Sequence, residues 1–207
     1  MKKTPTLEQF AAYQAAYDYF NRRLFENKLK PCLLNFRGKH KRNMGLFWPE
    51  KWARLKGGVT HEIALNPEVL HRPLIETFAT LVHEMAHQWQ QDWGTPPRGG
   101  YHDRGWGQRM EQIGLIPSNT GEPGGKKTGQ QMTHYVAKDG AFETAFQMMP
   151  KTVSLPWLTG SFAEVVKSPS KNKNKVKYTC ECGTTVWGKA DLLILCGECE
   201  EQFMQQE

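Results

Sequence analysis

Residues 77–90 read TFATLVHEMAHQWQ and place His83, Glu84 and His87 inside an apolar run. Apolar side chains recur at spacings of three and four residues around this stretch, which predicts an amphipathic helix over about residues 71–91. Residues four apart on a helix lie on the same face, so both imidazoles are presented to one point. The stretch therefore predicts a metal site on a largely apolar helix.

The pattern His-Glu-x-x-His suits metal-assisted hydrolysis of a peptide bond. A zinc ion lowers the pKa of its bound water toward about 7, and a neighbouring carboxylate takes the proton and passes it to the leaving amine. We therefore expect His83 and His87 to bind zinc and Glu84 to be the general base. A helix with incidental histidines is the alternative, but chance gives this pattern in roughly one chain of this size in a hundred.

A catalytic zinc needs a third protein ligand and an open fourth position. One class of peptidase has a third histidine six residues after the second, but Trp93 occupies that position here. His102 is favoured because it follows a Gly/Pro-rich turn at which the chain can fold back. Glu111 is an alternative third ligand, and three histidines, expected to be surface or hydrogen-bonded residues, compete weakly: His61, His71 and His134.

Patterns on either side of this helix predict a mixed α+β domain. Helical spacing and a capping box at Thr6 and Gln9 predict a first helix that ends near residues 28–30. A small sheet is predicted from three short apolar segments, 32–36, 44–48 and 59–66.

A shorter helix is predicted within residues 101–115, with Asp103 as its cap or as a residue that orients a metal ligand. Residues 117–129 are rich in Ser, Thr, Gly, Pro and Lys, which predicts a surface loop. Residues 131–165 are expected to complete the domain.

Four of the five cysteines lie close together near the C-terminus, as Cys180-x-Cys182 and Cys196-x-x-Cys199. Two tight thiolate pairs predict a structural zinc ion, which would stabilise a module too small for a core of its own. Two disulfides are the disfavoured alternative, because no secretory signal follows the first residues and a cytoplasmic protein is expected. No membrane span is expected either.

The formal net charge of +6 and the pI near 9.0 favour anionic partners, nucleic acid first. The lysine-rich segment 167–177 predicts a solvated linker. Its lysines could bind phosphates, while the aromatic residues of the cysteine module, of an exposed type, could stack on bases. The expected contacts are Lys171, Lys173, Lys175, Lys177 and Trp187. In the alternative, the lysines only solvate a linker, and Tyr178, Trp187 and Phe203 pack the module.

The chain resembles the SprT-like metalloproteases, which include the DNA–protein crosslink protease Spartan. The resemblance rests on AYDYFNRRLFENKL, GLFWPEKW, HEIALNP, LVHEMAHQWQ, YHDRGWGQRMEQIGL and the terminal cysteines, in the order in which the family has them. It implies a zincin-like fold with a C-terminal zinc ribbon, zinc on His83, His87 and His102, and Glu84 as the catalytic residue. The loop after residue 117 is similar to that of bacterial, plasmid or phage members.

These observations predict a protease domain over 1–166, a basic linker over 167–177 and a four-cysteine zinc ribbon over 178–207, with one catalytic and one structural zinc ion. By the resemblance, the expected substrates are proteins bound or crosslinked to DNA, and the expected partner is single-stranded or damaged DNA, in crosslink repair near the nucleoid. Two alternatives stay open. One is a non-catalytic zinc protein that binds DNA or the transcription machinery, and the other is a general cytosolic peptidase without DNA dependence.

Overall fold

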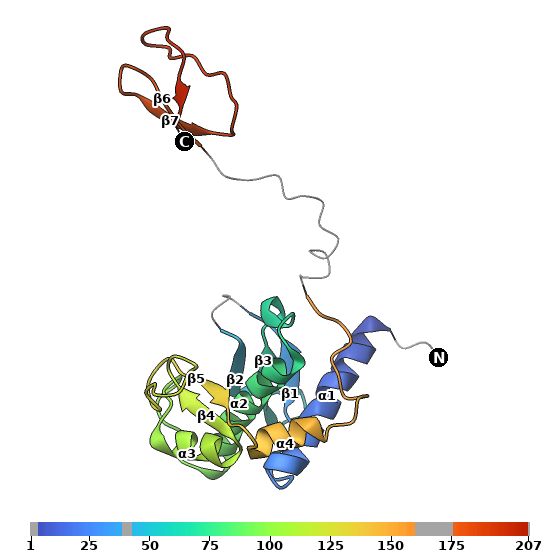
Figure 1. Cartoon of the computed structure of the whole chain (residues 1–207). Helices are drawn as coiled ribbons and strands as arrows, with labels where there is room; N and C mark the ends of the chain where they lie inside the picture. Colours follow the sequence, from blue (N-terminus) through green and yellow to red (C-terminus); the bar gives the residue numbers. More distant parts are fainter. Residues whose placement is uncertain (1–3, 39–42, 160–175, 207) are drawn as a thin grey trace. The chain divides into compact units, whose positions relative to one another are not determined.

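A computed structural model describes residues 4–38, 43–159 and 176–206, and the chain divides into two units, Met1–Ser161 and Phe162–Glu207 (Figure 1). The first unit combines helices with a small sheet, in agreement with the predicted α+β class. Most of the predicted linker, 167–177, lies outside the described residues, so the predicted domain boundaries stay predictions. Among the described helices, none combines the length and the apolar character needed to cross a membrane.

The first helix, α1 (Pro5–Leu24), does not begin as predicted. Thr4 is the N-cap residue and its side chain makes no capping hydrogen bond, so the predicted capping box at Thr6 and Gln9 is wrong. Pro5 takes the first helical position, where its fixed φ suits the helix and its missing N–H costs nothing.

The end of α1 also differs from the prediction of residues 28–30. Glu26 and Asn27 have φ values of 55° and 58°, a left-handed conformation that a helix cannot continue through. The Asn21 side chain then holds the returning chain, because its amide donates to the Leu29 carbonyl oxygen at 3.0 Å and its oxygen accepts from the Leu29 N–H at 3.1 Å. The helix therefore stops one turn early and the chain bends back against it.

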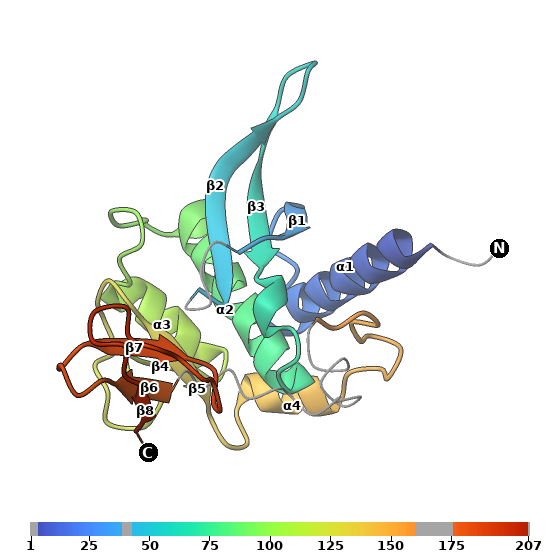
Figure 2. The ribbon, with the colours of Figure 1, turned by 90° about the horizontal axis from the view of Figure 1, so that it is seen from above.

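Three strands form the sheet of the first unit: β1 (Leu33–Phe36), β2 (Gly45–Ala53) and β3 (Val59–Leu65). Their order is β1-β3-β2, with β1 parallel and β2 antiparallel to β3, so β2 is an edge strand among the described strands. β2 continues past its predicted end at residue 48, with a register shift between Trp48 and Trp52. The longer strands make a β2–β3 hairpin that extends beyond the helices (Figure 2).

The remaining elements of the first unit are η1 (Pro67–Val69), α2 (Leu74–Trp93), α3 (Arg104–Gln112), β4 (Leu115–Ser118), β5 (Thr133–Val136) and α4 (Ala141–Gln147). α2 begins directly after Pro73, whose extended ψ of 139° separates it from the preceding turn. Asp103 caps α3 by accepting a hydrogen bond from the Trp106 N–H at 2.9 Å, which confirms the capping prediction. The sequence pattern predicted neither β5 nor α4.

The loop between β4 and β5 is closed at its base. The Asn119 N–H donates to the Lys126 carbonyl oxygen at 3.0 Å, and the Asn119 side-chain oxygen accepts from the Lys126 N–H at 2.8 Å. Beyond this closure, β4 and β5 pair antiparallel, with Pro117 opposite His134. Most of the predicted surface loop is indeed exposed, but its two ends are fixed by hydrogen bonds.

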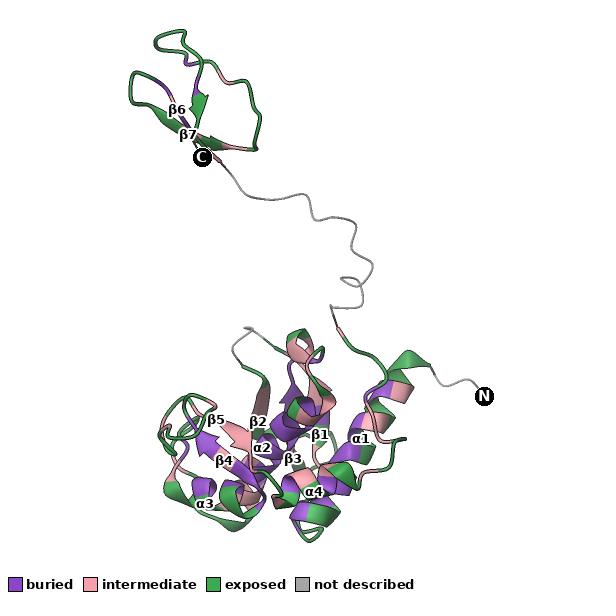
Figure 3. Ribbon diagram, in the orientation of Figure 1, coloured by how far each residue is buried: buried purple, intermediate pink, exposed green. Residues whose placement is uncertain are grey.

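Aromatic rings from three helices meet in the core of the first unit. Phe20 of α1 is fully buried and stacks on Phe142 of α4, with 5.6 Å between ring centroids, and meets Phe78 of α2 edge-on at 5.7 Å. Figure 3 shows that α1 is buried along one side and exposed along the other, whereas α2 is buried along most of its length. This packing fixes α2, the helix that carries the predicted metal ligands.

The second unit has a small antiparallel sheet of β6 (Val176–Thr179), β7 (Thr185–Gly188) and β8 (Met204–Gln205), in the order β7-β6-β8. Two cysteines, Cys180 and Cys196, pack with Tyr178 and Phe203 in its core. Tyr178 is only 1% exposed and Phe203 only 5%, so the expectation that these aromatic rings are exposed for stacking on bases is wrong.

The aromatic core predicts a large stability loss for Phe20→Ala. The substitution removes a fully buried ring between two helices, and we expect it to lower the free energy of unfolding by about 3–5 kcal/mol. Phe10→Ala in the same helix is the matched control, since Phe10 is 38% exposed, and should cost about 1 kcal/mol or less. Urea unfolding of both variants tests this, and equal losses would contradict the proposed centre of the core.

Candidate metal centres

Helix α2 carries three predicted site residues in its second half. His83 and Glu84 are buried, at 8% and 7% exposure, and His87 is partly exposed. The rings of His83 and His87 meet edge to face with centroids 5.1 Å apart, as expected for residues one turn apart. Apolar neighbours such as Val82 and Met85 are fully buried and hold this turn against the core.

His102 reaches the same point from the residues just before α3. It forms a backbone bridge with Gly129, in which the His102 N–H donates to the Gly129 carbonyl oxygen at 2.8 Å and the Gly129 N–H donates back at 3.0 Å. One ligand atom from each of His83, His87 and His102 lies within 4.8 Å of the other two. The structure therefore brings the favoured third ligand together with the two histidines of α2.

Hydrogen bonds occupy one nitrogen of two of these rings. Nδ1 of His102 lies 3.2 Å from the carbonyl oxygen of Gly129, which can only accept, so Nδ1 carries the proton. Nδ1 of His83 lies 3.0 Å from Nδ1 of His134. In both rings Nε2 is the nitrogen left for a metal, and the bond on Nδ1 orients the ring, as partners of metal-binding histidines commonly do.

The surroundings favour the neutral form of all these imidazoles. Burial, reinforced by the neighbouring histidines, holds the pKa of His83 well below its usual value. Burial, together with His102, lowers the pKa of His87 to about 3, and burial lowers the pKa of His102 as well. A neutral imidazole offers a lone pair to a cation, so the cluster suits a metal ion.

Glu84 lies in the same turn of α2, and burial shifts its pKa in the opposite direction to those of the histidines. Burial raises the pKa of its carboxyl group to about 8, while the backbone N–H of Phe47 acts to lower it. Strand β2 passes close by, since a Cβ atom at Gly45 would lie 2.6 Å from Glu84 Oε1 and 2.9 Å from Thr80 Cγ2. The absence of a side chain at Gly45 thus lets the edge strand lie against the carboxyl group.

Of the four competing ligands, three lie away from the three histidines, and the fourth contacts them without joining them. Glu111 forms an ion pair with Lys127 at 2.6 Å on the surface. His61 is hydrogen-bonded to a carboxylate at 3.2 Å and His71 is exposed, as expected for both. His134 touches the cluster through His83 but is not one of the three residues whose ligand atoms converge.

Trp106 of α3 is a neighbour of the cluster that was not among the predicted site residues. Its ring is fully buried, with its centroid 4.4 Å from that of His102, 4.9 Å from that of His83 and 5.1 Å from that of His87. The only sequence signal was its position four residues after His102. The indole therefore forms a wall that limits how the three imidazoles turn.

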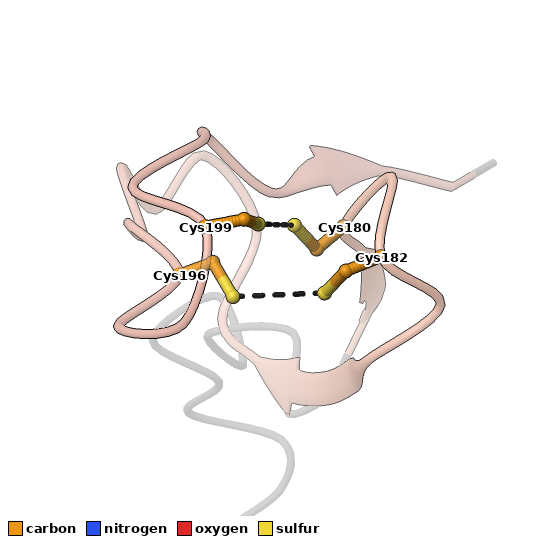
Figure 4. Close-up of side chains that lie close together, drawn as sticks. All are labelled: Cys180, Cys182, Cys196 and Cys199. Atoms are coloured by element: carbon orange, nitrogen blue, oxygen red, sulfur yellow. Dashed lines mark hydrogen bonds between the residues drawn. The ribbon is translucent and has the colours of Figure 1, made fainter.

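Figure 4 shows the four cysteine side chains of the second unit pointing toward one another. The Sγ atoms of Cys180 and Cys199 are 3.2 Å apart, those of Cys182 and Cys196 are 3.7 Å apart, and all are free thiols. The four Sγ atoms lie within 4.8 Å of one another. The Thr184 hydroxyl and backbone N–H lower the pKa of the Cys182 thiol to about 6, which favours the thiolate form that binds metals.

Three of the expected nucleic-acid contacts, Lys171, Lys173 and Lys175, lie outside the described residues. Lys177 and Trp187 are cross-strand partners in the β6–β7 pair, and both are exposed, Trp187 at 62%. The structure thus places these two side by side, and their contact with nucleic acid stays a prediction.

The model of the SprT-like family matches residues 13–127, more than half of the chain. The chain belongs to the SprT-like family. An uncharacterised protein from the mucB 3′ region of Salmonella typhimurium is 38% identical to this SprT-like chain over 56 residues, which are 27% of this chain and 74% of that protein. This relative is consistent with the expected bacterial or plasmid variety. No solved structure matches the chain.

The SprT-like match covers the residues of the imidazole cluster but neither His134 nor the four cysteines. The match to the family model therefore covers the first candidate metal centre only. The second rests on the convergence of the four thiols.

The raised pKa of Glu84 predicts a pH-dependent stability of the chelator-treated protein. A carboxyl group whose pKa rises from 4.5 in the unfolded chain to about 8 binds its proton more tightly when folded. The contribution of Glu84 to stability should therefore fall as the pH rises from about 4.5 to about 8, by roughly 2–4 kcal/mol, and level off above that. The buried histidines, whose pKa values are lowered, give both proteins the same opposing pH dependence, so the loss appears as the difference from Glu84→Gln. Glu84→Gln cannot ionise and should lack this loss. Urea unfolding of both proteins in EDTA across this range tests it, and parallel curves would contradict it.

Proposed function

We propose that this SprT-like protein is a zinc-dependent peptidase whose metal is held by His83, His87 and His102. The observation that carries the proposal is the convergence of three neutral imidazoles, two with Nδ1 already hydrogen-bonded, beside a buried carboxyl group. Three nitrogen ligands and an open position are the usual protein contribution to a catalytic zinc. When bound, zinc would acidify a water molecule and polarise the peptide carbonyl group.

Glu84 is the proposed general base. With a pKa of about 8 its carboxyl group keeps its proton at neutral pH, unless a nearby positive charge lowers that pKa. A divalent ion on the three imidazoles is such a charge, so loading of the site and activation of the base are coupled. The carboxylate then takes a proton at its oxygen and delivers it to the amine that leaves.

Strand β2 supports a peptide as the substrate. It is an edge strand among the described strands, and an extended peptide can add to such an edge through backbone hydrogen bonds. Gly45 brings this edge against Glu84. A peptide paired with the first residues of β2 would thus run past the proposed base.

The four cysteines are proposed to hold a second, structural zinc ion. Four sulfur ligands in closed coordination leave no position for a substrate, and the module has few other buried side chains to stabilise it. The proposed zinc ribbon therefore depends on its metal to fold.

The proposed substrates are proteins bound or crosslinked to DNA. The net charge of +6 supports a nucleic-acid partner, and membership of the SprT-like family supports this substrate class by analogy. A general peptidase would share the same metal centre and differ only in lacking DNA dependence.

Counting metal ions tests the ligand assignment. The purified protein is expected to hold two zinc ions per chain, and His102→Ala should lose one of them, because two imidazoles alone bind zinc weakly. Glu111→Ala is the control and should keep both. Elemental analysis after dialysis measures this, and retention of two ions by His102→Ala would direct attention to His134.

Cleavage tests the chemistry. The protein should cleave an unstructured, histone-like substrate, and Glu84→Gln should keep its zinc and fold while losing at least about 100-fold in rate, since general-base catalysis is worth that much. Assays with and without single-stranded DNA at two salt concentrations test the substrate class. Unchanged cleavage by Glu84→Gln refutes the mechanism, and cleavage that ignores DNA favours the general peptidase.

A further inference from the structure

The β2–β3 hairpin ends in an apolar side chain between two cations. Gly57 and Gly58, with φ values of 89° and 92°, form the turn together with a hydrogen bond from the Arg54 N–H to the Gly58 carbonyl oxygen at 2.9 Å. Leu55 at the tip is fully exposed, and Arg54 and Lys56 on either side of it are exposed as well. Leu55 is thus not packed against the described part of the first unit, and the tip extends beyond the helices (Figure 2).

Two tryptophans lie on the same hairpin, each 42% exposed. Trp52 has a structural task, since its Nε1 donates to the fully buried Glu62 carboxylate at 2.6 Å. Trp48 has no such bond among the described residues, and the Nζ atom of Lys51 lies 3.8 Å from its ring centroid. Trp48 therefore offers an indole ring beside two cations, since Cζ of Arg37 also lies 5.7 Å from its centroid.

The exposed charges of the hairpin are mainly positive. Within the described part of the chain, Lys51, Arg54 and Lys56 form no ion pair, while Glu50 is the exposed acid of the hairpin. The other acid, Glu62, is buried and bound to Arg37 at 3.1 Å. Unpaired cations interleaved with exposed aromatic and apolar side chains are the pattern of proteins that bind single strands.

We propose that the β2–β3 hairpin binds single-stranded nucleic acid. Lys51, Arg54 and Lys56 contact phosphates, a base stacks on Trp48, and Leu55 inserts between neighbouring bases, as apolar side chains do where nucleic acid is unstacked. Because β2 also lies against Glu84, a protein attached to the strand is brought toward the proposed base. This inference rests on the nucleic-acid partner proposed above and gives that partner a place in the fold.

The hairpin fits this partner better than the cysteine module does. Residues 176–206 of that module contain five acidic side chains, at Glu181, Asp191, Glu198, Glu200 and Glu201, against two lysines. Acidic side chains repel phosphates, so they weaken any binding of nucleic acid at Lys177 and Trp187.

Binding of a fluorescent oligothymidylate to the full chain, followed by anisotropy over a range of salt concentrations, tests the proposal. All proteins carry Glu84→Gln, so that binding is measured apart from cleavage. Arg54→Gln with Lys56→Gln should weaken binding about tenfold and reduce the slope of log K against log salt by about 1.4, the value for two contacts on a single strand. The matched control, Lys138→Gln with Lys151→Gln, removes two exposed charges elsewhere in the unit.

Trp48→Ala should weaken binding by about fivefold or more, as loss of one stacked base does, with the exposed Trp93→Ala as its control. Melting temperatures establish that each variant is folded.

Hairpin variants that bind like their controls overturn the proposal, as does a parent protein that binds no oligothymidylate at low salt. A change only in self-association, measured by sedimentation, overturns it in favour of a contact between copies. Zinc-dependent cleavage without DNA is assayed separately, so failure of the peptidase proposal is distinguishable.

Discussion

The first unit depends on keeping two imidazoles and a carboxyl group uncharged on one turn of α2, with His83 and Glu84 buried and His87 partly so. Burial pushes the histidines toward their neutral form and Glu84 toward its protonated form. This turn remains in place because the other side of the helix packs against aromatic rings at the centre of the core. Packing of the core thus offsets the free energy that it costs to bury these polar groups, which could bind a cation.

Much of the imidazole cluster could be predicted because two of its residues lie close together in the sequence. Spacing alone puts His83 and His87 on one face of a helix, whatever surrounds them. His102 required a guess about a turn, and what fixes it is a backbone bridge to Gly129, far along the chain. Hydrophobic periodicity cannot predict such a bridge, because the bridge joins residues far apart in the sequence. The contact between His134 and His83 also joins distant residues and was not predicted.

The fold was predicted best where hydrophobic periodicity is strong and worst where single residues decide. Helices α2 and α3 and strands β1 and β3 lie close to their predicted positions, whereas β2 is longer than predicted and α4 was not predicted. Pro5 and the left-handed Glu26 set the two ends of α1 away from their predicted residues. Tyr178 and Phe203 resemble exposed aromatics in sequence, yet a module with so few apolar residues needs them in its interior. Composition is a poor guide to exposure in a module of that size.

The hydrogen bonds that close the β4–β5 loop divide it into a part that positions His102 and a part that is exposed. Gly129, near one end, holds His102, whereas residues 120–125 lie beyond the Asn119–Lys126 hydrogen bonds and make no contact with the imidazoles. Those six residues are therefore a suitable insertion point, where an additional peptide or a whole domain could be added to the chain without changing the imidazole cluster.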